Sequence, residues 1–170
     1  MYKRQGRNLV YLLGTGADIW GVDADTDAVA AVRQLAARLA PGLPDDRFSV
    51  SPLETLTFPD GFFTVVLSSA VLHFSSGDDQ FASMLQSMWR VLAPGGMLFC
   101  RLASSIGIES AVQRLQNGRF RLPDGTTRYL VDEAGLEQWR LALGAKLLDP
   151  LKTTIVHGQR SMTTWVLRKD

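Results

Sequence analysis

Apolar and polar positions along the chain alternate between a helical and a strand-like pattern. In residues 25–42, apolar side chains recur every three or four positions between an acidic start and a Pro-Gly stop, which predicts an amphipathic helix. Similar patterns predict helices over 7–14, 78–92 and 132–144. Short apolar runs predict buried strands over 18–23, 47–50, 62–67 and 97–103, with 62–67 as a central strand. This alternation is typical of a layered α/β fold.

The last third of the chain adds a different pattern. Residues 108–118 have a helical pattern, and 119–131 resemble a hairpin around Pro123-Asp124-Gly125. Two strand-like runs flank "HGQR" near the C-terminus, close enough in sequence to pair antiparallel. We therefore predict a mixed, mostly parallel sheet that ends in an antiparallel hairpin.

Composition narrows the class of protein. The chain has 170 residues, 46% of them hydrophobic, and a net charge of +1, so we expect one domain spanning 1–170. A nucleic acid or an anionic membrane is not expected as the main partner, because the sequence lacks a basic excess. The apolar run near the N-terminus is too short for a membrane span and lacks a signal-peptide cleavage site, which predicts a cytoplasmic protein.

Cys100 is the only cysteine and lies within the apolar segment "GGMLFCRLA". It has no cysteine partner for a disulfide or for a cysteine metal site. We interpret it as a small buried hydrophobic residue and predict no metal site.

The stretch "YLLGTGADIWGVDAD" contains a glycine pair and an acidic strand end, as nucleotide-binding loops do. In such a unit a helix separates the loop from the acidic residue, which follows about 20 residues on. Asp23 lies only seven residues after Gly16, which leaves no room for that helix. Gly14 and Gly16 are therefore predicted to end a helix, and Gly6 is the better candidate for the loop.

From about Gly6 onward the chain resembles the class I S-adenosylmethionine-dependent methyltransferases, in particular small bacterial enzymes of the tellurite-resistance type. The resemblance rests on Gly6 followed by "RN", on Asp23 at the family's spacing, and on "FPDGFFTVVLSSAVLHF" and "VLAPGGMLFC" in that order. The terminal "KTTIVHGQRSMTTWVLRKD" looks like the family's last two strands. The implied fold is a Rossmann-like methyltransferase fold, and the implied cofactor is S-adenosylmethionine.

The resemblance also implies where the cofactor is held. Asp23 would accept hydrogen bonds from the ribose hydroxyls of the cofactor, and the backbone amide of Leu53 would donate to its adenine. Ser68 and Ser69 would lie beside the methionine part of the cofactor. The implied cofactor-binding residues are Gly6, Asp23, Ala24, Leu53, Ser68 and Ser69. His73 is a candidate for substrate contact or for a base, and the other substrate-side candidates are Tyr129 and Arg160, with Arg128 and His157 beside them.

The sequence departs from this family in three places. The family's first strand is absent, two loop glycines are replaced by Tyr2 and Arg4, and Pro52 stands where an acidic residue would contact adenine. Tyr and Arg side chains obstruct the close backbone approach that the loop requires, so we expect weakened or lost cofactor binding. The first strand would be central, so we expect an N-terminally truncated fold with a gap in its sheet. Direct pairing of the family's strands two and four, a second chain as in a homodimer, or an upstream natural start would each close that gap, and we favour the upstream start.

Two functions remain open at this point. The first is methyl transfer from S-adenosylmethionine to a small-molecule acceptor, which depends mainly on orienting the reactants, so no catalytic residue is assigned. The second is a non-catalytic protein in which the fold survives as a binding or dimerisation module. An NAD-dependent protein would need a complete G-x-G-x-x-G before the first helix and gives no reason for the terminal hairpin.

Overall fold

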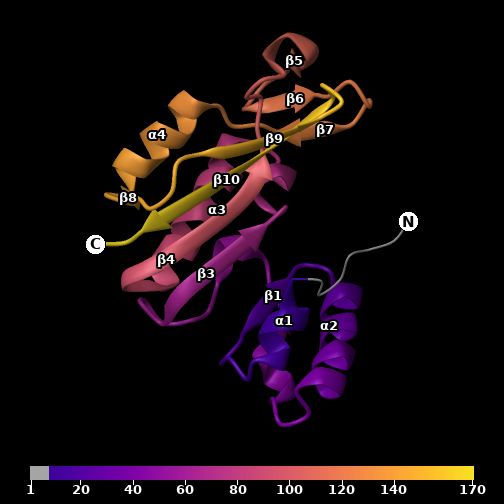
Figure 1. The fold of residues 1–170 in the computed structure, drawn as a ribbon, viewed down its shortest axis with the longest axis vertical. Coiled ribbons are helices and arrows are strands. Elements are labelled where there is room, and N and C mark those ends of the chain that lie inside the picture. The colour runs from indigo at the N-terminus through magenta and orange to yellow at the C-terminus, as the bar shows by residue number, and fades with distance from the viewer. Residues whose placement is uncertain (1–7) are drawn as a thin grey trace. The chain divides into compact units, whose positions relative to one another are not determined.

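The computed structural model describes residues 8–170, which form two compact units. Unit 1 ends at Leu56 and unit 2 runs from Thr57 to Asp170. Figure 1 shows the helices and strands of each. Gly6, predicted as the remnant of the glycine loop, lies outside the described residues. No helix within 8–170 is both long and apolar enough to cross a membrane.

Unit 1 contains two parallel strands and two helices. Its elements are α1 (Leu9–Gly14), β1 (Gly21–Asp23), α2 (Thr26–Leu39), β2 (Phe48–Val50) and the short 3-10 helices η1 (Asp45–Arg47) and η2 (Leu53–Thr55). β1 pairs with β2 in parallel, with Asp23 opposite Val50. The prediction that Gly14 ends a helix is confirmed. The sequence allowed Asp25, Thr26 or Asp27 as the cap of the next helix, and the structure selects Asp25, which accepts hydrogen bonds from the amides of Asp27 and Ala28.

A small hydrophobic core holds unit 1 together. It comprises the buried side chains of Leu13, Ile19, Val29, Ala36 and Phe48. The guanidinium of Arg33 also donates twice to the carbonyl of Phe48, at 3.0 and 2.6 Å, and so fastens α2 to β2. The helical spacing of apolar residues in α2 thus places the helix on the strand pair.

Unit 2 is built on a five-stranded mixed sheet. Its strands are β3 (Phe63–Ser69), β4 (Leu92–Ala103), β8 (Lys146–Leu147), β9 (Lys152–Val156) and β10 (Arg160–Arg168). The order is β3-β4-β10-β8, with β9 also paired to β10. β3 and β4 are parallel, whereas β10 is antiparallel to its partners. The predicted C-terminal hairpin is confirmed, and it turns at His157 and Gly158, which both have positive φ.

Helices and a second small sheet complete unit 2 (Figure 1). The helices are α3 (Asp78–Val91) and α4 (Glu133–Ala142), with η3 (Leu72–Phe74) and η4 (Glu109–Ala111) as 3-10 turns. The second sheet joins β5 (Gln113–Arg114), β6 (Arg119–Arg121) and β7 (Thr127–Tyr129) in antiparallel order. The main core includes the fully buried side chains of Phe81, Leu85, Met88, Leu98, Trp165 and Leu167.

Two predictions for unit 2 need correction. Residues 108–118 form η4 and β5 in place of a helix, because this segment pairs with the β6–β7 hairpin and tertiary pairing outweighs its weak helical pattern. β3 was expected to be central, yet among the described residues it pairs only with β4 and ends the strand order. Although β3 is a continuous apolar run, the side chains of Val65 and Leu67 are about half exposed.

Candidate functional site

In unit 1, Asp23 lies at the carboxyl end of β1, as predicted. Its backbone carbonyl accepts from the Ser51 amide at 3.0 Å, and its Oδ1 accepts from the Asp25 amide at 2.9 Å. The side chain is exposed, and Oδ2 has no hydrogen-bond partner in the described part of the chain. The carboxylate is thus oriented by the turn into α2 and keeps one oxygen for hydroxyl donors.

Leu53 lies at the same edge of unit 1, because β1 and β2 are parallel and the chain passes from Val50 through Pro52 into η2. Leu53 is the first residue of η2, so its N–H precedes the first intrahelical bond and remains available. Ala24 is exposed and directly follows Asp23. These three predicted cofactor residues therefore belong to one end of the β1–β2 pair.

In unit 2, Ser68 and Ser69 lie at the carboxyl end of β3, opposite Cys100 and Arg101 of β4. Ser68 is 4% exposed, and its hydroxyl has no hydrogen-bond partner in the described residues. A buried polar group without a partner costs about 1–3 kcal/mol. Such a group persists at a strand end when a ligand or ordered water completes its hydrogen bonds.

The backbone directly after these serines is strained. Ala70 has φ of 63°, and its amide donates to the carbonyl of Arg101 at 2.7 Å. A left-handed conformation costs a non-glycine residue about 1–2 kcal/mol. Strain of this kind clusters at functional sites, where the surrounding structure maintains it. No sequence pattern indicates this conformation, because alanine usually has negative φ.

His73 of η3 is buried, and its Nδ1 accepts a hydrogen bond from the Ala103 amide at 3.3 Å. Burial, together with the smaller effect of the positive charges of Arg128 and Arg101, lowers the pKa of His73 to about 4. The imidazole is therefore neutral at pH 7. Since Nδ1 accepts, Nε2 carries the proton and is a donor.

Two arginines surround this part of η3. The guanidinium of Arg128, on β7, lies 4.9 Å from the ring centroid of Phe74 and donates to the Thr127 carbonyl at 2.7 Å. Arg101 lies opposite Ser69 in the β3–β4 register. Sequence reasoning missed Arg101, although one charged residue in the apolar run "MLFCRLA" was a usable signal.

The other substrate-side candidates have different surroundings. Tyr129 is buried, stacks on Phe81 with ring centroids 4.5 Å apart, and donates its hydroxyl to Asp78 at 2.9 Å. Burial and this carboxylate raise the pKa of Tyr129. The guanidinium of Arg160 forms an ion pair with Asp124, which joins β10 to the β6–β7 turn. The side chains of Tyr129 and Arg160 therefore hold together the elements next to Arg128. His157 lies in the β9–β10 turn.

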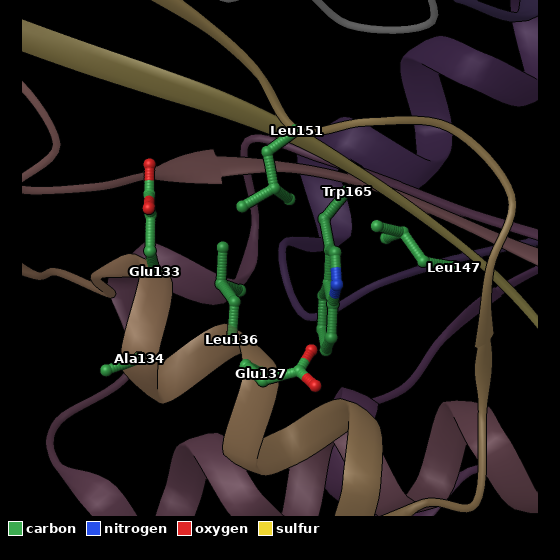
Figure 2. A pocket seen from close by; sticks show the side chains of 7 residues that line it. All are labelled: Glu133, Ala134, Leu136, Glu137, Leu147, Leu151 and Trp165. Atoms are coloured by element: carbon green, nitrogen blue, oxygen red, sulfur yellow. The ribbon is translucent and has the colours of Figure 1, made fainter.

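A pocket also lies between α4 and the sheet of unit 2 (Figure 2). Leu136, Leu151 and Trp165 turn toward its middle, and Glu137 at its rim pairs with Arg140. None of the predicted site residues lines it. Its lining is mostly apolar, with Glu133 at the start of α4.

Two further groups bear on the chemistry of unit 2. Cys100 is buried, as predicted, and burial raises the pKa of its thiol to about 12, which keeps it unreactive. Within residues 8–170, no three His, Cys, Asp or Glu side chains gather in a way that could hold a metal ion.

Comparison with known proteins decides the family. Residues 4–100 match the family model described as "Methyltransferase domain", which is more than half of the chain. The chain belongs to this family. The match confirms the methyltransferase resemblance, the Rossmann-like fold and the S-adenosylmethionine cofactor that the sequence implied. The comparison with curated protein sequences found no match for this methyltransferase.

Solved structures agree on the fold. A protein from Pyrococcus horikoshii is 16% identical with a TM-score of 0.74, and the alignment covers 98% of this chain and 79% of that one. A S-adenosylmethionine-dependent methyltransferase from Methanosarcina mazei is 17% identical with a TM-score of 0.69, covering 95% and 86%. A 1,6-didemethyltoxoflavin-N1-methyltransferase from Burkholderia thailandensis, solved with S-adenosylhomocysteine, is 18% identical with a TM-score of 0.69, covering 97% and 67%.

Proposed function

We propose that this methyltransferase binds S-adenosylmethionine and transfers its methyl group to a small-molecule acceptor. The observation that carries the proposal is the buried hydroxyl of Ser68, which has no partner in the described residues and stands at the carboxyl end of β3. Ligands of open α/β sheets bind outside the carboxyl ends of the strands. A polar ligand there would complete the hydrogen bonds of this hydroxyl.

Residues of each unit have a proposed part in binding. In unit 1, Asp23 would accept hydrogen bonds from the ribose hydroxyls through its free carboxylate oxygen, and the Leu53 amide would donate to the adenine. Ala24 would lie against the adenosine. In unit 2, Ser68 and Ser69 would contact the methionine part of the cofactor. We also propose a single methyltransferase domain over 1–170, and the inclusion of parts of both units in the family match over residues 4–100 supports it.

When bound, S-adenosylmethionine supplies an electrophilic methyl group on a sulfonium centre. The chain's own contribution is orientation, which in such displacements replaces a protein nucleophile. His73 donates from Nε2 because its Nδ1 is occupied by the Ala103 amide. We therefore propose that His73 positions the acceptor by donating a hydrogen bond and does not remove a proton at Nε2.

Calorimetry with S-adenosylhomocysteine tests the binding. We expect heat of binding with the wild-type chain, and an affinity about three to ten times lower for Ser68→Ala, because one hydrogen bond is lost. Without ligand, the same variant should unfold with a free energy about 1 kcal/mol higher, since the unsatisfied hydroxyl is gone.

Ser104→Ala is the matched control, because Ser104 is equally buried but fully engaged. Its hydroxyl lies 3.0 Å from that of Ser161 and 2.7 Å from that of Thr163. We expect this variant to lose about 1–3 kcal/mol of stability and to keep its affinity for the ligand. Absence of heat at millimolar S-adenosylhomocysteine would contradict the proposal.

The alternative function is a non-catalytic binding or dimerisation module. The observation in its favour is the edge of β3, which pairs with nothing but β4 among the described residues. An open edge presents backbone donors and acceptors to another strand. A chain that dimerises and fails to bind S-adenosylhomocysteine would support this alternative.

A further inference from the structure

We propose that the acceptor is an anionic molecule, a carboxylate carried on a flat apolar body, held by Arg128 and Arg101 against Phe74. This inference rests on the proposed methyl transfer and adds the substrate class. All of its residues belong to unit 2, with Arg101 near the carboxyl end of β4, Arg128 on β7 and Phe74 on η3, which follows β3.

The region around His73 is positively charged. Elsewhere in the described chain, carboxylates neutralise arginines, in the ion pairs of Arg47 with Asp18, Arg90 with Asp60, Arg140 with Glu137 and Arg160 with Asp124. Within residues 8–170, neither Arg101 nor Arg128 takes part in such an ion pair. Both charges act on His73, and no acidic group of the described chain is among the causes of its lowered pKa. The region therefore carries positive charge that a ligand can neutralise.

The hydrogen-bond donors of Arg128 and His73 suit a ligand with acceptor oxygens. Arg128 uses one N–H on the neighbouring carbonyl of Thr127, which leaves the rest of its planar fork for a ligand. Such a fork matches the two oxygens of a carboxylate. Nε2 of His73 adds a neutral donor, because Nδ1 is bound to the Ala103 amide. Donors predominate here, which favours a ligand rich in acceptor oxygens.

An apolar surface lies beside these donors. Phe74 is 62% exposed although it lies within η3, between buried residues, and Val71 just before η3 is 40% exposed. Arg128 covers part of the Phe74 ring. A flat apolar body can pack against the exposed remainder while its carboxylate reaches the guanidinium. A small inorganic anion would use the charge but not this surface.

The test compares benzoate with benzamide, which has the same shape but no charge. Ligand-observed and protein-observed NMR titrations give the affinity of each for the purified chain. We expect benzoate to bind at least about ten times more tightly than benzamide, because hydrogen bonds to charged groups are the stronger ones.

Variants locate the binding. Arg128→Met and Arg101→Met should each weaken benzoate binding about tenfold or more, and Arg128→Lys should restore only part, because lysine lacks the fork. Arg168→Met is the matched control, since Arg168 is exposed at the far end of β10, opposite Met97. It should bind benzoate as the wild type does. Circular dichroism checks that each variant folds, and comparison of the two arginine variants guards against one of them misfolding.

Three outcomes overturn the inference: equal affinity for benzoate and benzamide, benzoate binding that survives both arginine variants, or no binding of benzoate up to its solubility limit. S-adenosylhomocysteine binding, measured on the same protein by calorimetry, separates this from the proposed function. If that ligand binds while benzoate fails, the proposed cofactor binding stands and the substrate class is wrong. If benzoate binds while S-adenosylhomocysteine does not, the anion site stands and methyl transfer fails.

Discussion

At the scale of single residues, His73 shows how surroundings decide chemistry. The sequence offered the residue for substrate contact or for a base. Burial and two neighbouring arginines keep the imidazole neutral, and the Ala103 amide occupies its Nδ1. A neutral imidazole with Nδ1 occupied donates from Nε2. Tertiary structure thus favours the contact over the base.

The stability of the chain should depend on pH through His73. Its pKa is about 4 in the folded state against an ordinary value of 6.5, so the unfolded chain binds the additional proton between these values. The contribution to stability is complete above pH 6.5 and is lost as the pH falls toward 4, by about 3 kcal/mol in all. Urea unfolding from pH 7.5 to pH 4 measures this loss.

His73→Asn is the control for that titration, because the amide oxygen can accept the hydrogen bond of the Ala103 amide without taking up a proton. The variant should be less stable than the wild type at pH 7 but should lose less stability between pH 6.5 and pH 4. Parallel pH profiles for the two proteins would show that His73 titrates normally in the folded state.

At the scale of elements, the Pro94-Gly95-Gly96 segment does more than end a helix. The sequence predicted a stop after α3, but β4 already begins at Leu92 and passes through the glycines, with an irregular register against β3. Gly95 has φ of 75°. A Cβ on Gly96 would lie 2.8 Å from the carbonyl oxygen of Ala93 and 2.9 Å from that of Thr64. The close approach of β3 and β4 thus requires glycine at 96.

Gly96→Ala should therefore lower the free energy of unfolding by about 1–3 kcal/mol or more, because backbone atoms must move apart. Gly42→Ala is the control, since a Cβ at Gly42 meets nothing within 4 Å and its φ is not in the left-handed range. That change should be neutral or slightly stabilising. Chemical denaturation of both variants measures the difference, and equal stabilities would contradict this account of the β3–β4 approach.

At the scale of the whole molecule, the predicted single domain can be tested by unfolding. The chain forms two compact units that divide after Leu56, yet the family match runs from residue 4 to residue 100 and so includes parts of both. A single methyltransferase domain should unfold cooperatively.

We expect one thermal transition, coincident by circular dichroism and by tryptophan fluorescence, since Trp20 lies in unit 1 and Trp165 in unit 2. S-adenosylhomocysteine at about 100 times its Kd should add about 2.7 kcal/mol of stability and shift the whole transition upward. Two separate transitions, of which the ligand moves only one, would contradict the single domain.

The sequence by itself determined most of the elements and the family. Local signals sufficed for them: the Asp25 cap and the apolar spacing of α2, the apolar run of β3, and the turn at His157-Gly158 are properties of neighbouring residues. Asp23 and Ser68 could be proposed because they end strands.

Only the tertiary structure decided which groups are left without partners, because that depends on residues far apart in the chain. Among the described residues the hydroxyl of Ser68 has no hydrogen-bond partner, whereas that of Ser104 is bonded to the hydroxyls of Ser161 and Thr163. Arg160 is bound to Asp124, 36 positions away, whereas Arg128 meets Phe74 and acts on His73. Burial and charge at these positions are sums over distant neighbours, and no local pattern encodes them.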